Sequence, residues 1–304
     1  MSTRAAIVRY FDETVPYYRV FWHGGAGALH FGMRGPGVTR HRDELLNANR
    51  VLADAASIRS GERVLDAGCG VGGSAIWLAR ERGARVLGLT LSPEQVLVGT
   101  EAARLAGVAE CVELRVADYT ESQLPDASVD VVWAHESACY AADKRALVAE
   151  AARILRPGGR VVVADGFRAR APRLGERALC RAFERGLELP PLAPIDSLLS
   201  DLRECGFVVA LSESRLRDVT PSSRRLFWRC LLSYPLALLG WAIGRVPKAL
   251  LANSLSGVSL YPMVVLGVVD YCLVVAVKAH DSSDPRATPH SPSALPSSNA
   301  RIRL

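Results

Sequence analysis

The sequence contains no C-x-x-C motif, and its seven cysteines are scattered along 304 residues. This pattern argues against a zinc ribbon and against a framework of disulfide bridges, and it favours reduced thiols in the cytosol. The N-terminus, Met-Ser-Thr-Arg, carries no apolar leader, so we expect a cytoplasmic protein that is not exported.

Metal-ligand spacings and blocks of basic residues are lacking as well. No group of Asp, Glu and His residues has the spacing of a metal site, which predicts that no metal is required. The net charge is +6, but Arg and Lys are spread along the chain. We therefore expect solvated charged faces and no nucleic-acid partner.

A glycine-rich turn follows an apolar segment at residues 63–74. The segment and the residues after it predict a strand, a tight turn and the start of a helix. Glycines have no Cβ and let the backbone approach a ligand closely. Gly68, Gly70 and Gly73 also fit the dinucleotide fingerprint, so the glycines alone do not separate a nicotinamide enzyme from a nucleoside-sulfonium binder.

Residues at the ends of three predicted strands favour a protein that binds a nucleoside sulfonium over a nicotinamide enzyme. Asp66 ends the first strand, where a carboxylate can pair with an ammonium group and would repel a diphosphate. The second strand ends in Thr90, without the acidic residue that a dehydrogenase uses to hold ribose. Asp118 and Tyr119 follow the third strand and offer a carboxylate and a ring to an adenine.

Four segments, residues 64–72, 88–95, 117–118 and 155–160, resemble the class I S-adenosylmethionine-dependent methyltransferases. Within that family, Gly-Leu-Thr-Leu-Ser at 88–92 is similar to the cyclopropane synthase, sterol and tocopherol methyltransferase group. The resemblance implies S-adenosylmethionine as cofactor, bound by Asp66, Gly68, Cys69, Gly70, Gly72, Thr90, Leu91, Ser92, Gln95, Ala117, Asp118, Tyr119 and His135. Many members end the second strand with Glu or Asp; here Thr90, Ser92 and Gln95 take that place, as in the named group.

Apolar segments alternate with helical patterns along the chain. They predict strands near 62–67, 84–89, 111–116, 128–134, 159–165, 206–210 and 271–278, and helices that include 38–58 and 195–205. This alternation requires an α/β fold, a mostly parallel sheet with helices on both faces. The resemblance implies a Rossmann-like, seven-stranded sheet with an antiparallel last strand. Arg156-Pro157-Gly158-Gly159 is expected to be a turn before the fifth strand.

We divide the chain into five parts on these patterns. They are an N-terminal helical cap (1–58), a cofactor-binding core (59–220), an apolar helical lid (221–270), the last core strand (271–279) and a disordered tail (280–304). In the lid region, 226–244 and 258–277 are each about long enough to cross a membrane. Arg229, Pro235 and Asp270 interrupt them, so we expect a lid over a lipophilic acceptor, with peripheral membrane contact as a further expectation.

The fourth predicted strand delivers His135 and Glu136 to the ligand-binding edge of the sheet. Glu136 can orient a hydroxyl or amine, or stabilise a carbocation and remove its proton. The group resembled here commonly has Glu at this position. The structural alternative is a carboxylate that satisfies free amides at a helix N-terminus. His135 is expected to contact the cofactor, with proton transfer as the weaker alternative.

The first 31 residues hold seven of the twenty aromatic residues. Tyr17 and Phe21, like Tyr18 and Trp22, are four apart and would share a helix face after a start at Pro16. His30-Phe31-Gly32 resembles an element that borders the cofactor in related methyltransferases. We expect a cap hinged at residues 24–27, with substrate contacts from Tyr17, Tyr18, Trp22, His30, Phe31 and Tyr140. The alternative is a helix that only docks on the core.

Together these patterns predict an S-adenosylmethionine-dependent methyltransferase for a small lipophilic acceptor. Carbon methylation of an isoprenoid or sterol-like substrate comes first, with Glu136 as base or cation stabiliser. One alternative is N- or O-methylation of an aromatic or alkaloid-like natural product. Another is a non-methylating cyclase or accessory protein on the same scaffold, since fold does not fix reaction. The oligomeric state does not follow from the sequence.

Overall fold

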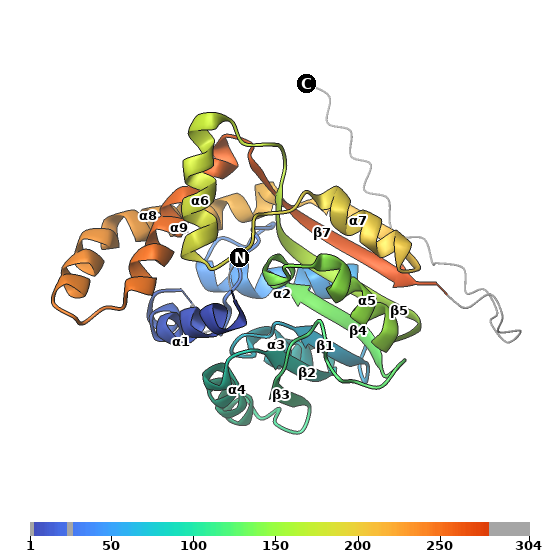
Figure 1. Ribbon diagram of the computed structural model, residues 1–304. Helices are drawn as coiled ribbons and strands as arrows, with labels where there is room; N and C mark the ends of the chain where they lie inside the picture. Colours follow the sequence, from blue (N-terminus) through green and yellow to red (C-terminus); the bar gives the residue numbers. More distant parts are fainter. Residues whose placement is uncertain (1–2, 23–26, 280–304) are drawn as a thin grey trace, which may run out of the picture.

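A seven-stranded sheet forms the centre of the computed structural model, which describes residues 3–22 and 27–279 (Figure 1). Its strand order is β3-β2-β1-β4-β5-β7-β6. The strands are β1 (Arg63–Ala67), β2 (Arg85–Thr90), β3 (Val112–Val116), β4 (Val129–His135), β5 (Leu155–Arg168), β6 (Phe207–Ser214) and β7 (Val269–Lys278). Only β7 runs antiparallel to its neighbours, so the predicted fold class is confirmed.

Helices cover both faces of this sheet. They are α1 (Arg4–Phe21), α2 (His41–Ala55), α3 (Gly73–Arg82), α4 (Pro93–Leu105), α5 (Lys144–Ile154), α6 (Arg177–Gly186), α7 (Ile195–Glu204), α8 (Leu216–Ala242) and α9 (Lys248–Val265), with short 3₁₀ turns at Ala138–Tyr140 and Leu174–Glu176. Successive strand residues point to opposite faces. Val64 therefore packs with α2 and α3, whereas Leu65 packs with α5 and α7.

The N-terminal helix begins earlier than predicted. It starts at Arg4, and Pro16 lies inside it instead of at its first turn. Thr3 caps the helix, because its hydroxyl accepts a hydrogen bond from the Ala6 N–H at 3.2 Å. The predicted start at Pro16 was wrong because a proline inside a helix removes only one backbone donor. Residues 24–26 of the predicted hinge and the predicted tail, 280–304, lie outside the described residues.

Three predicted boundaries also move. Strand β5 begins at Leu155, which pairs with Val129; residues 156–159 then form an irregularity within the strand, and pairing with β4 resumes at Arg160. Boundaries drawn at 220 and 270 fall inside α8 and β7. Helix α6 was not predicted, although Leu179, Phe183 and Leu187 have helical spacing.

Helices α8 and α9 form a hairpin that extends away from the sheet (Figure 1). Gly257 brings the helices together, since a Cβ there would lie 2.4 Å from the Cys230 Sγ. Gly186 does the same for α6, where a Cβ would meet the Ala252 carbonyl at 2.1 Å. Among residues 3–22 and 27–279, no helix combines the length and the apolar character needed to cross a bilayer.

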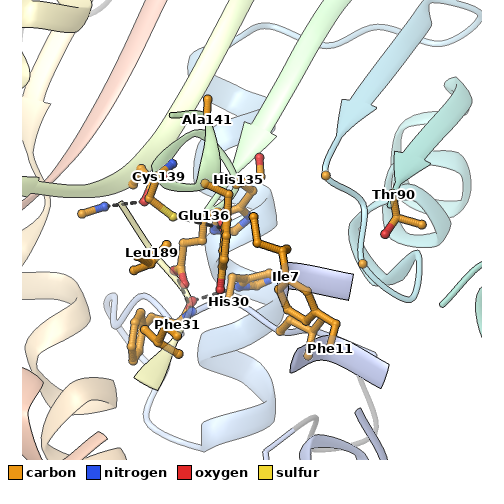
Figure 2. Close-up of a pocket in the computed structure, with 18 of the residues that line it drawn as sticks. Ile7, Phe11, His30, Phe31, Thr90, His135, Glu136, Cys139, Ala141 and Leu189 are labelled. Atoms are coloured by element: carbon orange, nitrogen blue, oxygen red, sulfur yellow. Dashed lines mark hydrogen bonds between the residues drawn. The ribbon is translucent and has the colours of Figure 1, made fainter. Parts of the chain in front are cut away.

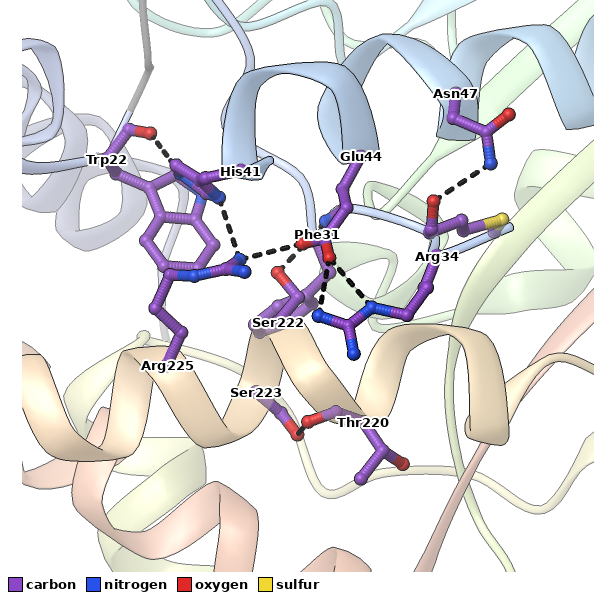
Figure 3. Close-up of polar contacts among 12 residues, drawn as sticks. Trp22, Phe31, Arg34, His41, Glu44, Asn47, Thr220, Ser222, Ser223 and Arg225 are labelled. Carbon is purple, nitrogen blue, oxygen red and sulfur yellow. Dashed lines mark hydrogen bonds and ion pairs between the residues drawn. The ribbon is translucent and has the colours of Figure 1, made fainter. Parts of the chain in front are cut away.

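A buried carboxylate ties the base of this hairpin to α2 (Figure 3). Glu44 has no exposed side-chain surface; Arg34 Nη2 lies 3.1 Å from Oε1 and Arg225 Nη1 lies 2.7 Å from Oε2. Arg225 also donates to His41 Nδ1 at 3.1 Å, and His41 Nε2 donates to the Trp22 carbonyl at 2.7 Å. The network fixes α8 beside the segment that leads from α1 to α2.

We expect Arg225→Met to lower the free energy of unfolding by about 2–3 kcal/mol, because it leaves a buried carboxylate with one cation in place of two. Urea denaturation measures this difference. The matched control is Arg224→Met, which alters an exposed neighbour and should cost no more than about 0.5 kcal/mol. Equal losses in the two variants would contradict the assigned role of the Glu44 network.

Candidate active site

A cavity of about 410 Å³ lies where the carboxyl ends of β1, β2, β4 and β5 meet α1 and α9. Of the predicted site residues, those that line it are Asp66, Gly68, Cys69, Gly70, Thr90, Leu91, Ser92, Gln95, Ala117, Asp118, Tyr119, His135, Glu136, Tyr18, Trp22, His30, Phe31 and Tyr140. Two do not. Gly72 is the N-cap of α3 and faces Leu114, while Tyr17 lies elsewhere on α1.

The glycine turn forms one wall of the cavity. Gly68 has φ 85°, a conformation that favours glycine, and a Cβ there would lie 2.5 Å from the Cβ of Ser137. The N–H groups of Gly68 and Cys69 both donate to the Leu89 carbonyl at 2.9 Å, which fixes the turn against β2. Position 68 therefore requires glycine, and the turn lies along this wall of the cavity.

Asp66 lies beside this turn without a donor for one of its oxygens. Its side chain is buried, and Oδ2 has no hydrogen-bond partner among the described residues. Burial raises the pKa of Asp66 from 3.8 to about 7. A buried carboxylate without a partner is costly, so the position suits a ligand that brings a positive charge.

The second end of the cavity is built from β2, β3 and the start of α1. The Thr90 hydroxyl donates to Gln95 Oε1 at 2.5 Å, and the Ser92 hydroxyl donates to Asp12 Oδ1 at 2.5 Å. Asp118 is held by Arg4, whose Nη2 lies 2.7 Å from Oδ2. Helix α1 thus contributes both Asp12 and Arg4, which sequence reasoning missed because these contacts join distant parts of the chain.

Glu136 stands in the middle of the cavity (Figure 2). Its Oε1 accepts the Phe31 N–H at 2.7 Å and the Tyr271 hydroxyl at 2.9 Å, whereas no described residue donates to Oε2. The backbone of Glu136 has φ 52°, which costs a non-glycine residue about 1–2 kcal/mol. Burial, the largest cause, and nearby Asp165 raise the pKa of Glu136 to about 8, although both hydrogen bonds oppose the shift.

Asp165 is a third carboxylate at the cavity, and sequence reasoning missed it. Its oxygens accept the N–H groups of Cys139 at 2.8 Å and Gly166 at 2.7 Å, and burial raises its pKa to about 6. Like Asp66, it follows an apolar strand run, a signal that could have found it. No local signal of this kind marks Tyr271, because it reaches Glu136 from β7, 135 residues further along the chain.

His135 is buried and packs against a second histidine ring. Its ring stacks on His30 with centroids 3.8 Å apart, and neither ring nitrogen has a hydrogen-bond partner among the described residues. Burial, with a smaller effect of His30, holds the pKa of His135 well below its usual value. The ring is therefore neutral at physiological pH and lies along the cavity wall.

Comparison with known proteins agrees with this geometry. Residues 65–163 match the family described as "Methyltransferase domain". The chain is 36% identical over 171 residues to "27-O-demethylrifamycin SV methyltransferase" of Amycolatopsis mediterranei (56% of this chain, 63% of the relative). It is 31% identical over 221 residues to "Sterol 24-C-methyltransferase" of Eremothecium gossypii (70% of this chain, 58% of the relative). The chain thus spans about three fifths of each relative.

A solved structure shares the fold. The [4+2]-cyclase SpnF superposes with a TM-score of 0.77 and 21% identity, covering 92% of this chain and 97% of that one. The fold and the cavity are those of an α/β domain that takes its ligand at the carboxyl edge of the sheet. The matched domain and the relatives make the chain similar to the class I S-adenosylmethionine-dependent methyltransferases. The predicted resemblance and its cofactor, S-adenosylmethionine, are confirmed.

The cavity suits this cofactor. Asp66 would bind the ammonium group of its methionine part, and Asp118 would accept a hydrogen bond from its adenine amine. The turn at Gly68 would lie against the cofactor. The cofactor supplies a methyl group on a positively charged sulfur. The carboxylates of Asp66, Glu136 and Asp165 favour such a cation over a neutral or anionic ligand.

We expect Asp66→Asn to weaken binding while stabilising the cofactor-free protein at pH 8. Affinity for S-adenosylhomocysteine should fall about 10- to 100-fold with the loss of a charge-assisted hydrogen bond, as measured by calorimetry. Folded Asp66 resists ionisation, so the wild type loses stability as pH rises from about 4 to about 7, and the variant escapes this loss.

Thermal unfolding of both proteins at pH 5 and pH 8 tests the second effect. Asp196→Asn, an exposed change on α7, serves as the control and should alter neither affinity nor the pH dependence. Unchanged affinity in Asp66→Asn would contradict the assigned ammonium site.

Proposed function

We propose that the chain transfers a methyl group from S-adenosylmethionine to a small lipophilic acceptor. The observation that carries this proposal is Glu136, a carboxylate with one unbonded oxygen in a largely nonpolar cavity. Beyond the predicted cofactor residues, the cavity is lined by apolar side chains that include Phe11, Leu189, Leu192, Leu226, Leu260 and Val264. These surroundings support an acceptor with little charge at its reacting end.

Carbon methylation of an isoprenoid or sterol-like alkene is the first form of this proposal. The alkene π pair attacks the methyl carbon as the carbon–sulfur bond breaks and its electrons go to sulfur. The resulting carbocation loses a neighbouring proton to Glu136 Oε2, and the electrons of that C–H bond form a new alkene. A carboxyl with a pKa near 8 suits this task, because a base works best when its pKa is close to the operating pH.

The similarity to a sterol 24-C-methyltransferase supports carbon as the methylated atom. The hydroxyl of Tyr271 and the amide of Phe31 act as positioning groups, since both hold Oε1 and leave Oε2 directed to a ligand. Phe31 and Tyr18 place rings at the cavity, where a π face stabilises positive charge. The predicted substrate-binding residues other than Tyr17, which lies outside the cavity, remain part of this proposal.

The second form is O- or N-methylation of an aromatic or alkaloid-like natural product. The 36% identity to a rifamycin methyltransferase supports it. Glu136 would then accept the proton of a hydroxyl or amine as the new bond to carbon forms. A third form, a cyclase or accessory protein without methyl transfer, has only the shared fold of SpnF in its favour.

Incubation with methyl-labelled cofactor separates the three forms. The acceptors are a sterol, an isoprenoid diphosphate and an aromatic alcohol, and mass spectrometry with fragmentation locates the label. Label on carbon supports the first form, and label on oxygen or nitrogen supports the second. A converted acceptor without label would overturn methyl transfer.

We expect Glu136→Gln to lower kcat about 100- to 10,000-fold, because the amide cannot accept a proton. Affinity for S-adenosylhomocysteine should stay within about twofold, since the group is placed to act on the acceptor. Rates come from single turnovers with labelled cofactor. Glu110→Gln, an exposed carboxyl at the surface, is the control. Full turnover by Glu136→Gln would sink the base assignment.

The pH dependence of the wild type gives a separate test. Because burial raises the pKa of Glu136 to about 8, kcat/KM should rise with pH with its midpoint at or below this value. The cofactor's positive charge favours the carboxylate and moves the midpoint down. Asp165 raises this pKa, so Asp165→Asn should lower the midpoint further. A profile that is flat between pH 6 and pH 9 would rule out Glu136 as the base.

A further inference from the structure

From Val219 onward, the α8–α9 hairpin carries charge of one sign only. From Val219 to Val269 the sequence contains no Asp and no Glu, but it contains Arg224, Arg225, Arg229, Arg245 and Lys248. This segment therefore has a formal charge of +5, against +6 for the whole chain. The rest of the protein is nearly neutral, so a negatively charged surface would be drawn to this one element.

The outer surface of the hairpin is apolar. Eight large apolar side chains between residues 228 and 243 are exposed, namely Trp228, Leu231, Leu232, Leu236, Leu238, Leu239, Trp241 and Ile243. Those at 228, 232, 236, 239 and 243 follow helical spacing and share one side of α8. The end of α1 adds Val20 and Phe21, because Arg229 donates to the Phe21 carbonyl at 2.7 Å. A soluble monomer rarely leaves such a stripe in water.

The opposite side of the same helices belongs to the cavity. Leu226 of α8 and Asn253, Gly257 and Leu260 of α9 line it. Asn253 also donates to the hydroxyls of Tyr10 at 2.5 Å and Tyr18 at 2.8 Å, which binds α9 to α1. The hairpin is thus fixed to the site by its inner face, and its outer face has no partner among the described residues.

We propose that this outer face docks on an anionic lipid bilayer. Apolar side chains with flanking cations, two exposed tryptophans and no carboxylate match the two components of such a surface, hydrocarbon and lipid phosphate. A second copy of the chain fits less well, because it would bring the same cations against the first set, in which only Arg225 has its charge balanced by Glu44. Residues 280–304 offer only three large apolar side chains to cover the stripe.

Sedimentation with vesicles tests the proposal with the full chain. We expect binding to vesicles of phosphatidylcholine with phosphatidylglycerol, weaker binding to phosphatidylcholine alone, and loss as salt rises. Replacing Arg245 and Lys248 by Gln should weaken binding about 25-fold, at about fivefold for each cation. The combined change Leu232→Ser, Leu236→Ser, Leu239→Ser should weaken it at least tenfold.

A matched triple change controls for lost apolar surface in general. Leu97, Leu105 and Leu174 are 68%, 71% and 82% exposed, compared with 73%, 72% and 60% for Leu232, Leu236 and Leu239. Serine at the three control positions should leave vesicle binding unchanged. Binding of S-adenosylhomocysteine, measured in every variant, shows whether the protein is folded and keeps the methyl-transfer proposal separate from this one.

Three results would overturn lipid docking. They are a wild type that ignores both kinds of vesicle, equal vesicle binding by the two triple variants, and a dimer in sedimentation velocity that only the hairpin changes dissociate. The last result would assign the face to a second copy of the chain. Quenching of tryptophan fluorescence by brominated lipid gives an independent readout, which hairpin contact predicts and which does not depend on the triple variant folding.

Discussion

The hydrogen bonds to one oxygen of Glu136 join the parts of the chain that form the site. Oε1 receives the Phe31 amide from 105 residues upstream and the Tyr271 hydroxyl from 135 residues downstream. A buried carboxylate is costly unless donors meet it, so these two segments have fixed places beside the end of β4. Phe31 in turn positions the residues between α1 and α2, and Tyr271 lies near the start of β7, which follows α9. The N-terminal segment and the last strand therefore meet at the same carboxylate.

Three carboxyl groups in the cavity are costly to ionise without a cation beside them, and a cationic ligand lowers that cost. Burial raises the pKa of Asp66, Asp165 and Glu136 to about 7, 6 and 8, respectively. Each shift disfavours the ionised form in the empty site, and a positive ligand reverses the preference. A charged sulfur beside these groups would thus be bound and would at the same time make Glu136 a carboxylate able to accept a proton. The same buried carboxyl groups that are costly in the protein without ligand would thus become ionised, and able to accept a proton, once a cation is bound.

Local patterns were enough to predict most of the sheet and its turn. Strand positions follow from apolar runs, and Asp66, Asp118 and Glu136 were found because they follow such runs at the edge where ligands bind. Patterns failed where distant contacts decide. Residues 156–159 look like a turn but form an irregularity inside β5, between the pairs Leu155–Val129 and Arg160–Val131, and Pro16 looks like a helix start although Thr3 supplies the cap. Arg4, Asp12 and Tyr271 reach the site only through tertiary packing, which no window of sequence records.

The hairpin explains why 226–244 resembles a membrane span without being one. Leu226 faces the cavity and Cys230 faces α9, so one side of α8 is apolar for reasons of packing. The other side is apolar where nothing packs, and the two together give an unbroken apolar sequence. A hydropathy average along the sequence combines both sides of the helix and does not distinguish them. The structure separates the two sides: Leu226 on one side of the helix lines the cavity, and the side chains on the other side are exposed.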